Sequence, residues 1–200
     1  MSTVDLQRTG EIATLTLNNP SARNALSSEM RLELDDALHR IRKDEDVRAV
    51  ILTGAQGHFC AGGDIRNMSN SPRDAAAWRQ RMSQLHDNLM PLMTLDRPLI
   101  AAVDGVAYGA GFSFALMADF VLATPRARFC MSFLRIGLVP DCAAFHNLPR
   151  VVGAQRAKEL MLSAREVKAD EALALGIVME LHAPEQLMAR AQALAASMTH

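Results

Sequence analysis

The stretch LIAAVDGVAYGAG, residues 99–111, decides the fold, because a short apolar strand runs into a glycine-bearing loop and a helix-like sequence follows. The same arrangement occurs earlier, where AVILT (residues 49–53) leads into FCAGGDI (residues 59–65). Glycine lets the backbone approach a ligand closely, and a helix start offers unpaired N–H groups with a partial positive charge. Two such loops can aim two N–H donors at one oxyanion. The alternative is a pair of ordinary strand-to-helix turns.

Strand and helix patterns alternate around these loops. β-Branched and alternating residues predict further strands at 11–17, 120–123 and 127–130. Ser27 and Ser28 cap a predicted helix with apolar residues at helical spacing. Other helical patterns occur after Pro72 and at 112–117, 154–162, 166–175 and 184–198. Strands come early and alternate with helices, and the end is helical, so the chain is α/β; no repeat or linker divides residues 1–200 into two domains.

The predicted helix after Pro72 carries an apolar stripe. Trp78, Met82, Leu85 and Leu89 recur on one face. We interpret this stripe as part of the core rather than as a cofactor-binding face.

Composition excludes several classes of function. Half of the 200 residues are hydrophobic, 22% are charged and the net charge is −1, which is typical of a globular protein. No basic face with interleaved aromatic residues suggests nucleic acid, and no apolar run reaches the length of a membrane span. The first residues lack the pattern of a signal peptide, so we expect a cytoplasmic protein with neither nucleic-acid nor membrane partners.

The cysteines and histidines do not predict a metal site. Cys60, Cys130 and Cys142 are odd in number and far apart, which disfavours a disulfide framework or a zinc ribbon. We expect three reduced, semi-buried small residues. The six histidines show no metal-binding spacing, so we expect no metal.

Four segments together resemble one family. They are NPSARNAL (19–26), AGGD (61–64), residues 105–119 and GLVPD (137–141). Their order and spacing are similar to those of the crotonase (enoyl-CoA hydratase/isomerase) superfamily, from about residue 6 to 194. The motifs look most like the branch of epoxyphenylacetyl-CoA and dienoyl-CoA isomerases.

The resemblance implies a crotonase-like α/β fold of repeated β-β-α units followed by C-terminal helices. Family members use those helices for trimerisation, so we expect a homotrimer or a dimer of trimers. The chain ends at His200, sooner than the family usually does, and we expect the trimerisation and lid helices to be incomplete. The implied substrate is an acyl-CoA thioester, with coenzyme A as part of the substrate and no further cofactor.

Hydratases of this family use two glutamates, and this chain has neither. The matching positions hold Ser113 and Phe133, which cannot exchange a proton as a carboxylate does. Both are expected to contact substrate. The resemblance therefore favours isomerisation over hydration.

Asp141 matches a catalytic aspartate of the isomerases and of aryl-CoA dehalogenases. Its neighbours Phe133, Val139 and Pro140 would partly desolvate the carboxylate and raise its pKa towards that of a useful base. The alternative role is a helix N-cap, since small residues follow it. We predict that Asp141 is the acid/base.

The resemblance also assigns the remaining site residues. The backbone N–H groups of Gly63 and Ala110 would form the oxyanion hole, and Asp64 would hold the first loop. Contacts with CoA and the substrate are expected at Ala22, Arg23, Ala25, Ala61, Asp64, Ile65 and Arg66.

Two other functions stay open. GFSFA (residues 111–115) approximates a serine-hydrolase nucleophile elbow, with Ser113 as nucleophile and Asp141 and His146 following in hydrolase order. A non-catalytic acyl-CoA-binding protein would also explain the missing glutamates. Phe112, Phe114, Phe133 and Phe145 are expected near the site, where they suggest an aromatic or alicyclic acyl group; the alternative is that these phenylalanines simply fill the core.

Overall fold

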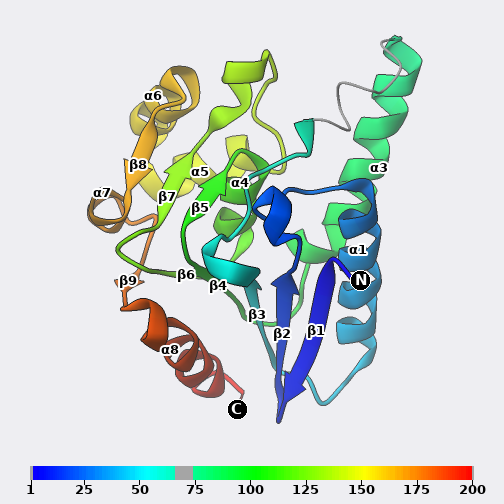
Figure 1. Cartoon of the computed structure of the whole chain (residues 1–200), viewed down its shortest axis with the longest axis vertical. Helices are drawn as coiled ribbons and strands as arrows, with labels where there is room; N and C mark the ends of the chain where they lie inside the picture. Colours follow the sequence, from blue (N-terminus) through cyan, green and yellow to red (C-terminus); the bar gives the residue numbers. More distant parts are fainter. Residues whose placement is uncertain (1, 66–73, 200) are drawn as a thin grey trace.

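The computed structural model describes residues 2–65 and 74–199. Its main sheet has the strand order β1-β2-β3-β4-β6-β9 (Figure 1). In chain order these strands are β1 (Val4–Thr9), β2 (Ile12–Leu17), β3 (Ala49–Gly54), β4 (Leu99–Val103), β6 (Phe120–Ala123) and β9 (Glu180–Leu181). β1 is antiparallel to β2, and all other pairings are parallel. The strands predicted at 11–17, 49–53, 99–103 and 120–123 are confirmed.

A second sheet has the order β5-β7-β8 and consists of β5 (Val106–Tyr108), β7 (Arg128–Cys130) and β8 (Glu166–Lys168). The helices are α1 (Ser28–Lys43), α3 (Ala75–Met93), α4 (Ala110–Met117), α5 (Ala144–Val152), α6 (Ala154–Ser163), α7 (Ala169–Ala174) and α8 (Pro184–Ala196). Short 3-10 turns lie at η1 (Pro20–Ala22), η2 (Ala55–Gly57) and η3 (Ser132–Ile136).

The main sheet is buried on both faces because its strands alternate between two apolar clusters. On β3, Val50 and Leu52 pack on the side of α1, with Leu34 of that helix in the same cluster. The intervening Ile51 packs on the other side, where Leu187 of α8 covers the sheet (Figure 1). Burial on both faces explains why β3 and β4 are nearly uniformly apolar.

Two predictions about elements need comment. Ser27 caps α1 as predicted, because its Oγ accepts the Met30 N–H at 3.0 Å. The helix predicted at 166–175 is wrong in its first part, where β8 pairs antiparallel with β7 before α7 begins. The sequence EVK is too short to show a strand period, and only its partner β7 makes it a strand.

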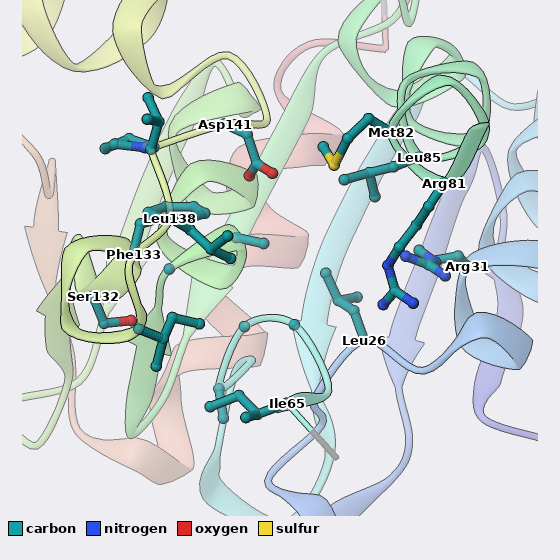
Figure 2. Close-up of a pocket in the computed structure, with 18 of the residues that line it drawn as sticks. Leu26, Arg31, Ile65, Arg81, Met82, Leu85, Ser132, Phe133, Leu138 and Asp141 are labelled. Carbon is teal, nitrogen blue, oxygen red and sulfur yellow. The ribbon is translucent and has the colours of Figure 1, made fainter. Parts of the chain in front are cut away.

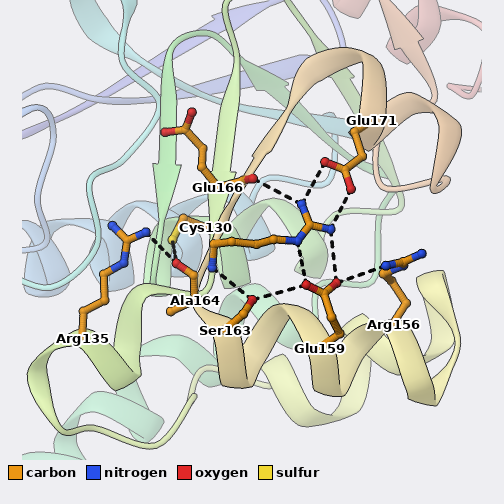
Figure 3. A network of polar contacts seen from close by, with 9 residues as sticks. Cys130, Arg135, Arg156, Glu159, Ser163, Ala164, Glu166 and Glu171 are labelled. Carbon is orange, nitrogen blue, oxygen red and sulfur yellow. Dashed lines mark hydrogen bonds and ion pairs between the residues drawn. The ribbon is translucent and has the colours of Figure 1, made fainter.

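A network of ion pairs and hydrogen bonds joins η3, α6 and α7 (Figure 3). Arg165 donates to Glu159 of α6 at 2.6 Å and to Glu171 of α7 at 2.7 Å. Next to it, the carbonyl of Ala164 accepts a 2.6 Å hydrogen bond from Arg135 of η3. η3 is thereby tied to the turn between α6 and β8, which matters because η3 forms one wall of the pocket described below.

Candidate active site

The two glycine loops predicted from sequence are hydrogen-bonded to each other. The Cys60 N–H donates to the carbonyl of Val106 at 2.9 Å, and the Tyr108 N–H donates to the carbonyl of Cys60 at 2.9 Å. On the outer side, the Leu26 N–H donates to the carbonyl of Gly62 at 2.8 Å. Backbone hydrogen bonds therefore join three segments that are far apart in sequence into one platform.

Glycine is required where these loops touch. Gly62 has φ +97°, and a Cβ there would lie 2.7 Å from the carbonyl oxygen of Tyr108. A Cβ on Gly111 would lie 2.2 Å from the carbonyl oxygen of Cys60. Neither distance is possible for a real side chain, so both glycines allow the first loop to pack against the start of α4.

The two predicted oxyanion donors belong to this platform. Ala110 is the first residue of α4, where backbone N–H groups lack an intrahelical partner, and Gly63 lies in the first loop. Both residues line the same pocket. Within the part of the chain that the structure describes, neither N–H donates to a protein acceptor. The positive end of α4 adds to the attraction for a negative oxygen.

The pocket has a volume of about 460 Å³ and is lined mostly by apolar groups (Figure 2). Its floor is the glycine platform with Leu26. One wall comes from η3 and the segment that follows, including Phe133, Leu138 and Asp141. The opposite wall is α3, which contributes Met82 and Leu85.

The α3 wall corrects the interpretation of the apolar stripe. Of its four residues only Leu89 is buried in the core, whereas Trp78, Met82 and Leu85 line the pocket and are half-buried. Helical spacing shows that one face is apolar, but it cannot distinguish a face that packs on protein from one that faces a ligand cavity.

Asp141 points into the pocket towards Met82 and Leu85 of α3 (Figure 2). Burial raises the pKa of this carboxyl above its ordinary value, and a hydrogen bond with Cys142 and the nearby His86 partly offset the effect. Oδ1 has no hydrogen-bond partner in the described residues. The N-cap alternative is wrong, because α5 begins after Ala143 and has no side-chain cap.

His86 is a site residue that the sequence analysis missed. It lies on α3, lines the pocket and acts electrostatically on Asp141. Its position next to the stripe residue Leu85 was the available signal, but that stripe was interpreted as core. His146, the histidine considered from sequence, is exposed and lies outside the pocket wall.

The position of Ser113 suits neither a substrate contact nor a catalytic nucleophile. It is fully buried, and its hydroxyl donates to the main-chain carbonyl of Asp141 at 3.1 Å. The expected substrate contact at Ser113 is therefore corrected: the side chain supports the loop that carries Asp141. The same burial removes the basis for the serine-hydrolase alternative, since a nucleophile must reach solvent and a base.

The expected cluster of phenylalanines around the site is wrong except for Phe133. Phe133 lines the pocket. Phe112 and Phe114 are fully buried in the core, where the ring of Phe112 packs on Phe129 with centroids 5.2 Å apart. Phe145 is 60% exposed and does not line the pocket. The suggestion of an aromatic acyl group loses most of its support.

The segment expected to contact CoA lies beside the first loop. The carbonyl of Arg23 accepts the Ala61 N–H at 3.0 Å, and Ala61 lines the pocket. Ala22, Arg23 and Ala25 are outside the pocket wall; Ala22 and Arg23 are exposed, so a bound CoA could reach them. Buried Asn24, which sequence reasoning passed over, holds the segment by donating to the carbonyl of His58 at 2.6 Å.

The remaining expected contacts follow Ala61 in the chain. Ile65 lines the pocket with 54% of its surface exposed, as a residue at an entrance would be. Asp64 is half-buried and is not part of the pocket wall. Arg66 lies outside the described residues.

The described residues contain three free, buried cysteines, at 60, 130 and 142. Burial raises the pKa of the Cys60 thiol to about 12, so it is not a nucleophile at neutral pH. Residues 2–65 and 74–199 hold no cluster of His, Cys, Asp and Glu suited to a metal ion. Within the same ranges no helix combines the length and apolar character needed to cross a bilayer.

Comparisons with known proteins show which family shares this sequence and this fold. The family model described as enoyl-CoA hydratase/isomerase matches residues 7–200. A 1,2-epoxyphenylacetyl-CoA isomerase from Escherichia coli (strain K12) is 37% identical over 92% of this chain and 71% of its own length. A short-chain-enoyl-CoA hydratase from Clostridium acetobutylicum is 36% identical over 98% of this chain and 74% of the relative.

A solved structure agrees with the sequence relatives. An enoyl-CoA hydratase/isomerase from Cupriavidus metallidurans CH34 superposes with a TM-score of 0.93 at 44% identity, covering 100% of this chain and 75% of its own. The fold and the paired loops thus define a crotonase-type protein. The chain belongs to the enoyl-CoA hydratase/isomerase family, whose members act on acyl-CoA thioesters.

Proposed function

We propose that the protein isomerises an acyl-CoA thioester through an enolate, with Asp141 as the acid/base and the N–H groups of Gly63 and Ala110 as the oxyanion hole. The observation that carries the proposal is the position of Asp141: among the described residues of the pocket wall it is the one carboxylate. Its pKa, raised by burial, makes it a better base than an exposed aspartate once it is ionised.

The proposed reaction needs no group beyond those described. The ionised Asp141 removes a proton from a carbon made acidic by conjugation to the thioester. The electron pair moves onto the thioester oxygen, where the N–H groups of Gly63 and Ala110 stabilise the enolate. Protonated Asp141, whose proton exchanges with solvent, then gives a proton to a different carbon of the same conjugated system. The double bond has moved, and no atom has been gained or lost.

Hydration is disfavoured on specific grounds. Adding water to a double bond needs one group to activate the water and another to deliver a proton. Ser113 is buried against backbone carbonyls and Phe133 has no titratable group, so neither family glutamate position supplies these functions. A relative of 37% identity is named an isomerase, which supports the same preference, whereas the 36% identical relative is named a hydratase.

A panel of enoyl-, dienoyl- and arylacetyl-CoA thioesters in deuterated water tests the proposal, with products analysed by mass spectrometry. We expect deuterium in the acyl chain and a shifted double bond. A product heavier by one molecule of water would show a hydratase and contradict the proposal. Binding of thioesters without exchange or turnover would instead identify a non-catalytic acyl-CoA-binding protein.

A further inference from the structure

Ser132 supplies the one hydroxyl of the pocket wall among the residues that the structure describes. It is the first residue of η3, is half-buried, and lies on the same wall as Phe133 and Asp141 (Figure 2). Within the described part of the chain, its Oγ has no hydrogen-bond partner. A hydroxyl without a partner is unfavourable once a ligand displaces the water around it, so the ligand must offer it a polar atom.

The Oγ of Ser132 lies against Gly109, the residue before the oxyanion donor Ala110. A Cβ on Gly109 would lie 3.2 Å from this oxygen and 3.9 Å from Cζ of the Phe133 ring. Gly109 has φ 51° and ψ −120°, and at this ψ a Cβ would eclipse the nitrogen of the next residue. The point that lies 3.2 Å from the Ser132 hydroxyl therefore flanks the Ala110 N–H, and the hydroxyl lies beside the space into which that N–H points.

Backbone contacts position this hydroxyl before any ligand binds. The Gly109 N–H donates to the carbonyl of Cys130 at 2.8 Å, which joins the start of α4 to the strand that leads into Ser132. Three residues further along η3, Arg135 donates to the carbonyl of Ala164 at 2.6 Å. A donor that is already in position needs no reorganisation during the reaction, and such donors contribute most to catalysis.

We propose that the Ser132 hydroxyl is a third hydrogen-bond donor to the thioester oxygen, beside the N–H groups of Gly63 and Ala110. This inference rests on the proposed enolate function. The oxygen of the thioester carbonyl is neutral, whereas the oxygen of the enolate is charged, so the hydrogen bond from Ser132 strengthens as the proton leaves the carbon. The apolar ring of Phe133 reduces the access of water to this oxygen, which makes each donor more effective.

The kinetics of deuterium exchange test the third donor. Ser132→Ala removes the hydroxyl and Ser132→Thr keeps one. With the thioester that wild-type protein exchanges fastest, we expect Ser132→Ala to lower kcat at least ~10-fold and to leave KM within ~2-fold, the effect of losing one hydrogen bond to a charged oxygen. Ser132→Thr should retain most of the activity. Ser83→Ala is the matched control, because Ser83 is exposed on α3 and lies outside the pocket wall.

The absorption band of bound cinnamoyl-CoA is a second readout, which a purely structural role of Ser132 would not change. This thioester has no proton whose removal gives a conjugated enolate, so it stays intact in the pocket. Its band moves to longer wavelength when the carbonyl oxygen accepts stronger hydrogen bonds. We expect the same shift in wild type, Ser83→Ala and Ser132→Thr, and a smaller shift in Ser132→Ala.

The outcomes separate this inference from the function on which it rests. If wild-type protein exchanges deuterium and Ser132→Ala matches it in kcat and in the absorption band, the third donor is overturned and the proposed function stands. A higher KM at unchanged kcat also overturns it, because the hydroxyl would then contact a part of the ligand that does not change in the reaction. Absence of both exchange and a band shift with wild-type protein would overturn the proposed function and the third donor together.

Discussion

At the scale of single residues, Asp141 lies in the pocket, and its ionised carboxylate lowers the stability of the folded protein. Burial raises its pKa in the folded protein above the ordinary value of a free aspartate. A folded state that holds this proton more tightly is destabilised when the group is ionised. The loss of folding free energy is complete at pH values above the pKa of Asp141 in the folded protein. The loss disappears as the pH falls through this pKa to below the pKa of a free aspartate.

Replacing the carboxyl by an amide removes this cost. We expect Asp141→Asn to melt at a higher temperature than wild type at pH 7, with the difference shrinking as the buffer is made acidic. Thermal unfolding followed by circular dichroism across this pH range measures both effects. A variant less stable than wild type at neutral pH would contradict the assignment of a destabilised, buried carboxylate.

The residues after Asp141 adopt a strained backbone. Cys142 has φ 51° and Ala143 has φ 61°, in the left-handed region that side chains disfavour. Ala143→Gly should stabilise the protein by about 1 kcal/mol, since glycine removes a left-handed penalty of about 1–2 kcal/mol but loses some chain entropy. Urea denaturation gives the difference in free energy of unfolding. A loss of stability would show that the Ala143 methyl group makes packing contacts that outweigh the strain.

At the scale of elements, the start of α4 is the feature on which the proposed oxyanion hole depends. Ala110→Pro deletes one N–H donor without removing a side-chain acid, and proline is tolerated at the first position of a helix. We expect kcat to fall ~10²–10³-fold, the cost of losing one such donor. Steady-state kinetics on the thioester selected by the panel measures the effect.

A matched proline controls for distortion. Ala154 is the first residue of α6, follows a glycine as Ala110 does, and lies outside the pocket. Ala154→Pro should keep wild-type kcat, and circular dichroism should show an intact fold for both variants. A folded Ala110→Pro protein with full activity would exclude its N–H from catalysis.

Among the helices and strands, some features could be predicted from the sequence and others could not. The strands feeding the two loops were predicted because each is a short apolar run closed by glycine, and Ser27 was recognisable as a cap. The α3 stripe was misassigned because periodicity does not reveal what faces an apolar surface. His86 was missed for the same reason, and β8 was missed because a three-residue strand exists only through its partner.

At the scale of the whole molecule, the apolar side chains of the C-terminal part of the chain pack mainly on their own chain. Ile177, Val178 and Leu187 are buried, whereas Leu173 is 42% exposed. These positions therefore say little about assembly, which remains a prediction from the family resemblance. We expect sedimentation equilibrium to give three or six times the chain mass of 21.8 kDa. A monomer at micromolar concentration would contradict the predicted trimer.

The central claim is that Asp141 moves the proton, and one comparison tests it most directly. Wild-type protein and Asp141→Asn are incubated with the best thioester in deuterated water, and deuterium in the acyl chain is followed by mass spectrometry while calorimetry measures thioester affinity. The account predicts that the variant binds nearly as tightly and exchanges ~10²–10⁴-fold more slowly, the usual loss on removing a general base. Exchange by the variant at the wild-type rate would contradict it.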